Sequence, residues 1–342
     1  MAYVRILIGL AISAGCVAAL LTQIDLHRTW IALTHARPAG LLLTLAILLA
    51  AMFTKVYRWR LLYYPTTGLR LWNLTSALFV GYMVSFFVPM RLGEFVRAYL
   101  IGKTEPVTFS QSVGTIVVEK VLDVLTILLF LAGLALFGLL PELAVPGWVL
   151  AMMGLGGLAL LAGLAWLPRD VVLRLLARLQ LHVPGSRRWN LVKMVGPLLD
   201  ALAILRYRQL LPALALWSLA NWALSSLVNY AAMWALDVPA PLTAAIFLMV
   251  VTNLGAVVPS APGYVGVFHG LAWVALAPYG IDPNQALGYA LALHALVFGT
   301  FIVAGLWFVW RGGYRLSDLW PRAGQRRARL EEPALLASGA PD

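Results

Sequence analysis

Apolar runs of about 20 residues decide what this chain can fold into, because a transmembrane helix needs about that length. Full-length candidates cover residues 4–22, 39–57, 110–139, 147–167, 209–236 and 284–310. The 342 residues are 62% hydrophobic and 11% charged, which is more apolar surface than a soluble domain of this length can bury. We therefore predict an all-α fold, a polytopic transmembrane helix bundle.

Two further apolar regions, 73–89 and 242–278, are short or interrupted by Pro and Gly, which is typical of broken or re-entrant helices. Lys and Arg favour cytoplasmic loops. Bases flank the first region on both sides, so a hairpin that enters from the cytoplasm is predicted there; they are Lys55, Arg58, Arg60, Arg70, Arg97 and Lys103. Asp237 and Asp282 flank the second region without a base, so its hairpin is expected to enter from outside.

The charge pattern thus predicts two halves of inverted topology, about 1–140 and 147–315, each with a broken helical hairpin. A membrane domain over residues 1–320 and a disordered cytoplasmic tail over 321–342 are expected. The net charge of +11 fits loops that face anionic lipid better than it fits nucleic-acid binding. We expect an integral protein of a prokaryotic inner membrane with both termini in the cytoplasm.

The first hairpin tip carries the strongest charge signal. Pro89 and Gly93 break the helix, and a helix that restarts near Gly93 directs its positive N-terminal end into the membrane. Arg91 and Arg97 add formal charge, so this tip is a candidate site for an anion such as a phosphate. Glu94 is expected to offset part of that charge. The structural alternative is an interfacial salt-bridge cluster.

Two carboxylates, Glu119 and Asp123, lie four residues apart on one face of the next predicted span. They need a cation to remain ionised together, and Arg91 or Arg97 is the expected partner, with Lys120 directed elsewhere. A structural ion pair that locks the hairpin is the alternative. No metal or cofactor is expected, because no His or Cys accompanies the carboxylates at ligand spacing.

The second tip is broken by Pro259, Pro262, Gly263 and Gly266, and is followed by His269; His294 lies in the last predicted helix. Histidine changes charge near neutral pH, so the two side chains form a possible titratable switch. The alternative is that they are ordinary core histidines.

Three segments resemble signatures of one family: Pro89-Met90-Arg91-Leu92-Gly93-Glu94-Phe95-Val96-Arg97, Glu119-Lys120-Val121-Leu122-Asp123 and Pro262-Gly263-Tyr264-Val265-Gly266. They are similar to the P-x-R-x-G-E-x-x-R, E-R-x-x-D and P-G-G-x-G motifs of the lysylphosphatidylglycerol synthase transmembrane region family, the flippase-like integral membrane proteins. Their order is the same, and the resemblance covers nearly the whole chain. Lys120 departs from the usual Arg, His269 from a frequent Glu and His294 from a frequent Arg.

The resemblance implies a lipid-handling membrane domain that moves an anionic phospholipid or a polyprenyl-linked headgroup between leaflets. Fused relatives carry an aminoacyltransferase domain after it, and no such activity is expected of this chain. We therefore predict a lipid flippase or scramblase that is not an enzyme and does not bind nucleic acid. Two alternatives stay open: an accessory protein that tethers a cytoplasmic lipid-modifying enzyme or glycosyltransferase, and a membrane-embedded transferase with Glu119 or Asp123 as general base.

Overall fold

The computed structural model describes residues 13–19, 22, 25–87, 92–141, 203–256 and 261–312, with isolated positions between 149 and 178. Every regular element within these residues is helical, which confirms the predicted all-α fold. The predicted spans at 4–22 and 147–167 lie largely outside the described residues, and so does the predicted tail at 321–342.

Nine α-helices are described: α2 (Leu26–Thr34), α3 (Pro38–Leu61), α4 (Leu71–Phe87), α5 (Gly93–Thr104), α6 (Phe109–Leu136), α10 (Leu211–Ala235), α11 (Leu242–Gly255), α12 (Val267–Leu276) and α13 (Pro283–Arg311). The segments Pro38–Leu61, Arg208–Ala235 and Pro283–Arg311 are long and apolar enough to cross a membrane. Helix α6, with 28 residues, is also long enough, but it carries Glu119, Lys120 and Asp123.

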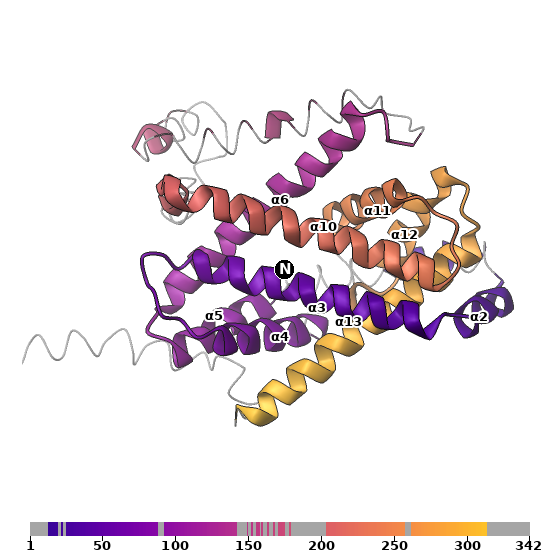
Figure 1. Cartoon of the computed structure of the whole chain (residues 1–342), viewed down its shortest axis with the longest axis horizontal. Coiled ribbons are helices and arrows are strands. Elements are labelled where there is room, and N and C mark those ends of the chain that lie inside the picture. Colours follow the sequence, from indigo (N-terminus) through magenta and orange to yellow (C-terminus); the bar gives the residue numbers. More distant parts are fainter. Residues whose placement is uncertain are drawn as a thin grey trace, which may run out of the picture.

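Helices α3 and α10 lie side by side and antiparallel through the middle of the fold (Figure 1). Arg37, just before α3, forms an ion pair with Asp237, just after α10. At the opposite end, Gln209 Nε2 donates a hydrogen bond of 2.9 Å to the Tyr64 hydroxyl. These two contacts define what we call the Asp237 end and the Tyr64 end of the bundle.

Both interrupted regions form helical hairpins, as predicted. In the first, Asn73 Nδ2 at the start of α4 donates a 2.7 Å hydrogen bond to Glu105 just after α5. In the second, the Phe247 ring early in α11 lies 6.2 Å from the Tyr279 ring just after α12. These helices have 10 to 17 residues, hence lengths of about 15 to 26 Å, short of the roughly 30 Å hydrocarbon core.

The two hairpins start at opposite ends of the bundle. Helix α4 follows α3 at the Tyr64 end, whereas α11 follows α10 at the Asp237 end (Figure 1). This arrangement agrees with the opposite directions of entry predicted from charge. An internal repeat that relates the two halves stays a prediction.

Glycines allow the backbone to turn and pack at both tips. Helix α5 starts at Gly93, where a Cβ atom would overlap the carbonyl oxygen of Gly81. At the second tip, Gly263 and Gly266 have φ of +71° and +84°, which favour glycine. A Cβ atom on Gly263 would lie 2.5 Å from the ring of Phe86 near the end of α4, so the two tips meet.

Of the four tip positions Pro89, Arg91, Pro259 and Pro262, only Pro262 lies within the described residues. Pro262 begins a short 3₁₀ turn over Pro262–Tyr264 at the second tip.

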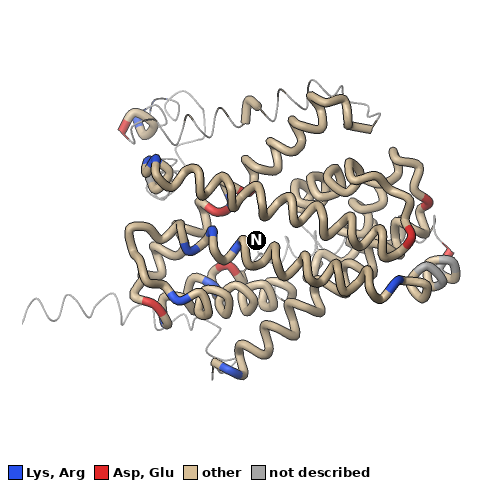
Figure 2. Tube along the Cα trace, viewed as in Figure 1, with Lys and Arg blue, Asp and Glu red and all other residues tan. Residues whose placement is uncertain are grey.

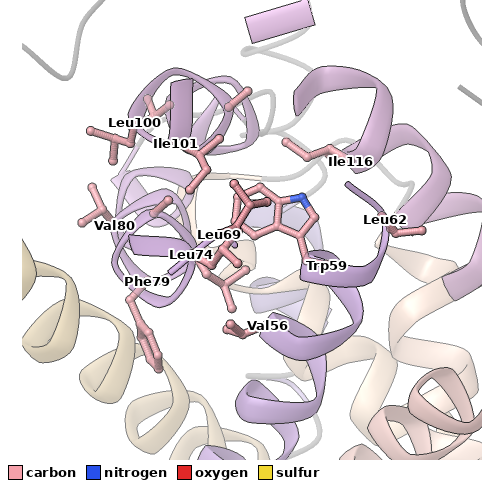
Figure 3. Close-up of a cluster of buried hydrophobic side chains, with 14 of the residues drawn as sticks. Val56, Trp59, Leu62, Leu69, Leu74, Phe79, Val80, Leu100, Ile101 and Ile116 are labelled. Atoms are coloured by element: carbon pink, nitrogen blue, oxygen red, sulfur yellow. The ribbon is translucent and has the colours of Figure 1, made fainter. Parts of the chain in front are cut away.

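A hydrophobic cluster packs the first hairpin against α3 and α6 (Figure 3). Trp59 of α3 is fully buried at its centre, with Leu69, Leu74, Ile101 and Ile116 around it. The outer surface is apolar as well: large side chains on three long helices are about two-thirds exposed, namely Leu42 at 67%, Leu216 at 64% and Val303 at 69%. Such a surface is suited to lipid rather than water.

Candidate functional site

Five charged side chains gather inside the bundle where α3, α5 and α6 approach one another, and we call them the buried ion cluster: Lys55, Arg58, Arg97, Glu119 and Asp123. None is more than 8% exposed. Figure 2 shows blue and red segments together at this place, within a largely uncharged interior. Because Glu119 lies ten residues after the start of α6 at Phe109, it is about 15 Å along that helix, far from its end.

Two close ion pairs form the core of the cluster. Arg97 holds Glu119 with both terminal nitrogens, at 2.5 and 3.2 Å. Arg58 Nη2 lies 2.5 Å from Asp123 Oδ1. The prediction that Arg97 pairs with the carboxylates is confirmed for Glu119, whereas Asp123 is paired with Arg58 instead. The alternative partner Arg91 lies outside the described residues.

Lys55 is the surplus cation of the cluster. Its Nζ lies 3.4 Å from Glu119 and 3.7 Å from Asp123, so it contacts two carboxylates that each already have a closer arginine. Three cations and two carboxylates give the buried ion cluster a formal charge of +1. A buried excess charge of this kind is unfavourable in a membrane unless an anion joins it.

Polar groups of α10 hold the cluster in place. Trp222 donates from Nε1 to Asp123 at 3.2 Å, and Arg58 donates from Nη1 to the Ser218 hydroxyl at 3.0 Å. The Nε atoms of Arg58 and Arg97 are buried and have no hydrogen-bond partner among the described residues. The two guanidinium groups therefore keep unused donor capacity beside the surplus charge.

Glu94 lies at the edge of this site rather than inside it. Its carboxylate is 2.8 Å from Lys120 Nζ, and both side chains are partly exposed, at 29% and 37%. The expectation that Lys120 points away from the cluster is therefore confirmed. Glu94, expected to offset part of the arginine charge at the tip, is instead bound by Lys120 on the outer side of α6.

The sequence analysis missed Lys55 and Arg58 as site residues, because it counted both among the cytoplasmic bases that flank the first hairpin, with Lys55 at the end of a predicted span 39–57 and Arg58 just beyond it. That boundary is wrong: α3 continues to Leu61, and both side chains are buried. The sequence does indicate a longer helix, because apolar and aromatic residues continue after Lys55 with Val56, Tyr57 and Trp59. The i, i+3 spacing of Lys55 and Arg58 places both on one face of a continued helix.

The two histidines lie together in the other half of the fold. The His269 and His294 ring centroids are 5.0 Å apart with 28° between the planes. His269 Nδ1 accepts a 3.3 Å hydrogen bond from the backbone N–H of Gly266. No described contact joins them to the buried ion cluster, and their role as a titratable switch stays a prediction. Within the described part of the chain, no three His, Cys, Asp or Glu side chains are grouped to hold a metal ion.

Comparison with known proteins agrees with this architecture. The family model described as "Lysylphosphatidylglycerol synthase TM region" matches residues 6–305. The curated "Glycosyltransferase AglD" of Haloferax volcanii is 28% identical over 275 residues, an alignment that covers 68% of this chain and 42% of that protein. The chain thus spans less than half the length of this relative. With three membrane-length apolar helices, it is an integral, lipid-related membrane protein that belongs to the lysylphosphatidylglycerol synthase transmembrane region family.

Proposed function

We propose that this protein moves the headgroup of an anionic lipid between membrane leaflets, as a flippase or scramblase, and does not alter the lipid covalently. The observation that carries the proposal is the surplus charge of Lys55, buried beside two carboxylates that arginines already neutralise. An anionic headgroup would bring the missing negative charge. Membership of a lipid-related family supports a lipid as its source.

The chemistry of the site favours a phosphate. Arginine donors suit phosphate oxygens, and Arg58 and Arg97 each have an Nε–H without a partner among the described residues. Arg97 lies in the first turns of α5, whose N-terminal end at Gly93 adds partial positive charge at the tip. The substrate class is therefore an anionic phospholipid or a polyprenyl phosphate, with its hydrocarbon chains remaining in the surrounding lipid.

We assign the Tyr64 end of the bundle to the cytoplasm of a prokaryotic inner membrane. The short segments at this end carry Arg60, Arg70 and Lys103, as the positive-inside rule requires. Helix α13 also finishes there with Arg311, because Trp307 near its end packs 5.4 Å from Trp72 at the start of α4. The C-terminus is accordingly assigned to the cytoplasm, and a membrane span over residues 4–22 would place the N-terminus there as well.

The test uses Lys55→Met, which makes the cluster neutral and leaves both arginine pairs intact. Purified protein is reconstituted in vesicles with fluorescent phosphatidylglycerol or a fluorescent polyprenyl phosphate, and a membrane-impermeant reductant reports headgroup movement. We expect a loss of at least about tenfold, equivalent to roughly 1.4 kcal/mol. Lys103→Met, which removes an exposed cation from α5, is the matched control and should retain activity. Equal activity of wild type and Lys55→Met on both lipids would reject the proposal.

A second candidate rests on the similar protein whose name is a glycosyltransferase. In that case the chain would bind lipid and tether a glycosyltransferase or lipid-modifying enzyme, or would itself transfer a group with Glu119 or Asp123 as base. Truncation after Arg322 should release a tethered partner and leave transport unchanged. Incubation with lipid followed by mass spectrometry would reveal a transferase by a product of new mass.

A further inference from the structure

The second tip is enclosed between two parts of the chain that are far apart in sequence. On one side, a Cβ atom on Gly263 would lie 2.5 Å from the Phe86 ring of α4. On the other side, a Cβ atom on Gly266 would lie 2.6 Å from the backbone oxygen of Ser13. Ser13 belongs to a helical segment over residues 13–19, which we call the N-terminal helix. The backbone of the second tip thus fills the space between α4 and the N-terminal helix.

The N-terminal helix holds the second tip by a hydrogen bond and by close packing. The Ala261 backbone N–H donates to the Ser13 hydroxyl at 2.8 Å, and Ser13 is only 5% exposed. In the first turn of α12, a Cβ atom on Gly270 would lie 3.7 Å from both Cβ and Sγ of Cys16. The contacts with the N-terminal helix therefore extend from the start of the tip into α12.

The second tip lies close to the buried ion cluster. Lys55 Nζ is 5.7 Å from the centroid of the Tyr82 ring in α4, and Phe86 follows Tyr82 by about one helical turn. The tip therefore packs on α4 one turn away from a residue that contacts the surplus cation. A displacement of the tip would uncover this part of α4 beside the cluster.

The second tip is held more weakly than the first hairpin. Two ion pairs join α5 of the first hairpin to α6, Arg97 with Glu119 and Glu94 with Lys120. Residues 256–268, in contrast, contain no Lys, Arg, Asp or Glu, so the side chains of the second tip form no such pair. Breaking a buried ion pair costs far more free energy than breaking a neutral hydrogen bond. Of the two tips, the second is therefore the easier one to displace.

We propose that the second tip is a movable gate beside the buried ion cluster and that the N-terminal helix, through Ser13, holds this gate closed. Ser13 is a positioning residue, because it acts through the backbone of the tip and not on the lipid. When the gate opens, the tip leaves both the N-terminal helix and Phe86, and a headgroup gains access to Lys55. The inference rests on the proposed function for the purpose of the opening, whereas the hold of Ser13 on the tip is tested separately.

A single substitution allows the gate to be locked. In Gly270→Cys the new Cβ atom lies 3.7 Å from that of Cys16, within the range of about 3.5–4.5 Å found in disulfides. Cys16 is the only native cysteine, so oxidation by copper phenanthroline in air joins no other pair within one chain. Alkylation of the denatured protein, followed by measurement of its intact mass, counts the thiols that remain.

Transport is compared before and after locking. Movement of short-chain fluorescent phosphatidylglycerol and polyprenyl phosphate is followed by back-extraction into albumin, which does not reduce disulfides. We expect oxidised Gly270→Cys to lose at least about tenfold in rate and a membrane-permeant thiol to restore it, which distinguishes a lock from damage to the fold. Gly133→Cys is the matched control: its Cβ atom meets nothing within 4 Å, so oxidation should leave both thiols and the rate unchanged.

Hydrogen exchange tests the hold of Ser13 without transport. Ser13→Ala removes the acceptor of the Ala261 N–H, so amide exchange in residues 261–266 should become roughly tenfold faster, as for one lost hydrogen bond. Thr22→Ala is the matched control, because the exposed Thr22 hydroxyl donates to the Ala19 carbonyl within its own segment. Exchange at the tip should be the same in Thr22→Ala and in the wild type.

Unchanged transport by fully oxidised Gly270→Cys, or unchanged exchange in Ser13→Ala, would overturn the gate and leave the proposed transport function in place. Two free thiols in Gly270→Cys after oxidation would also overturn it, since the Cys16–Gly270 contact would then be absent. If wild-type protein moves neither lipid, the transport function falls together with the opening of the gate. Faster exchange in Ser13→Ala would then still show that the N-terminal helix holds the tip.

Discussion

The guanidinium carbon of Arg97 lies 3.6 Å from the ring centroid of Trp59. The arginine is therefore stacked on an aromatic face while both of its terminal nitrogens hold Glu119. Trp59 in turn donates from Nε1 to Thr115 at 3.0 Å and lies at the centre of the hydrophobic cluster in Figure 3. The electrostatic site and the hydrophobic core of the first half are thus joined through one indole ring.

Removal of the Arg97 charge should destabilise the fold strongly. Arg97→Gln leaves Glu119 buried without its closest counter-ion, and breaking a buried pair in this way typically costs about 3–5 kcal/mol. Arg37→Gln is the control, because the Arg37–Asp237 pair is exposed and such pairs contribute about 0–1 kcal/mol. Denaturant unfolding in detergent micelles measures both variants. If Arg97→Gln and Arg37→Gln lose similar amounts of unfolding free energy, burial does not make the Arg97–Glu119 pair more important than the exposed pair.

A double substitution should recover much of that loss. In Arg97→Gln/Glu119→Gln the two partners are neutral together, while Lys55, Arg58 and Asp123 keep the formal charge of the cluster at +1. We expect at least about 1.5 kcal/mol of recovery relative to Arg97→Gln, within the range of coupling found for contacting residues. A double-mutant cycle of unfolding free energies gives this quantity directly. Strict additivity of the two single effects would be inconsistent with a direct pair.

Substitutions of Trp59 should separate its hydrogen bond from its ring. Trp59→Phe loses the Nε1 hydrogen bond to Thr115 and some packing, but keeps an aromatic face toward Arg97. Trp59→Leu loses the cation–π contact as well, for which about 2 kcal/mol is expected in a desolvated site. Thermal unfolding should therefore rank the wild type above Trp59→Phe and Trp59→Phe above Trp59→Leu. If the Leu variant is as stable as the Phe variant, the stacking of Arg97 on the aromatic ring does not contribute to stability.

A methyl group at Gly93 should disrupt the first hairpin. The added carbon overlaps the backbone of Gly81, which cannot move aside as a flexible side chain can. We expect Gly93→Ala to lower stability by about 1–3 kcal/mol or more, as overpacking does. Gly133→Ala in α6 is the matched control, since its Cβ would meet nothing within 4 Å. Proteolysis of the purified variants and their melting in detergent both report the difference.

Part of this site was predictable from sequence, because some signals are local. Pro and Gly at the tips predicted two hairpins, and the i, i+4 carboxylates Glu119 and Asp123 predicted a need for a buried cation. Lys55 and Arg58 were not found, since bases at the end of an apolar run are typical both of a loop and of a buried last turn. Only the packing of α3 against α6 and α10 decides between the two.

The surplus charge and the stacking of the two histidines were beyond sequence reasoning for a different reason. The formal charge of the cluster depends on which side chains from α3, α5 and α6 meet, and hydropathy gives no distances between helices. His269 and His294 are similarly separated in the chain, and their stacking follows from how α12 packs on α13. Amino-acid composition does not predict such contacts between helices.

The contact between Gly81 and Gly93 has a mechanical consequence. The backbones of α4 and α5 lie directly against each other at these two glycines, so the two helices of the first hairpin are expected to move together. Arg97 belongs to that hairpin, whereas Glu119 belongs to α6. If the first hairpin moves away from α6 in the proposed transport, it must break this buried ion pair, and an anionic headgroup would then take the place of the carboxylate beside Arg97.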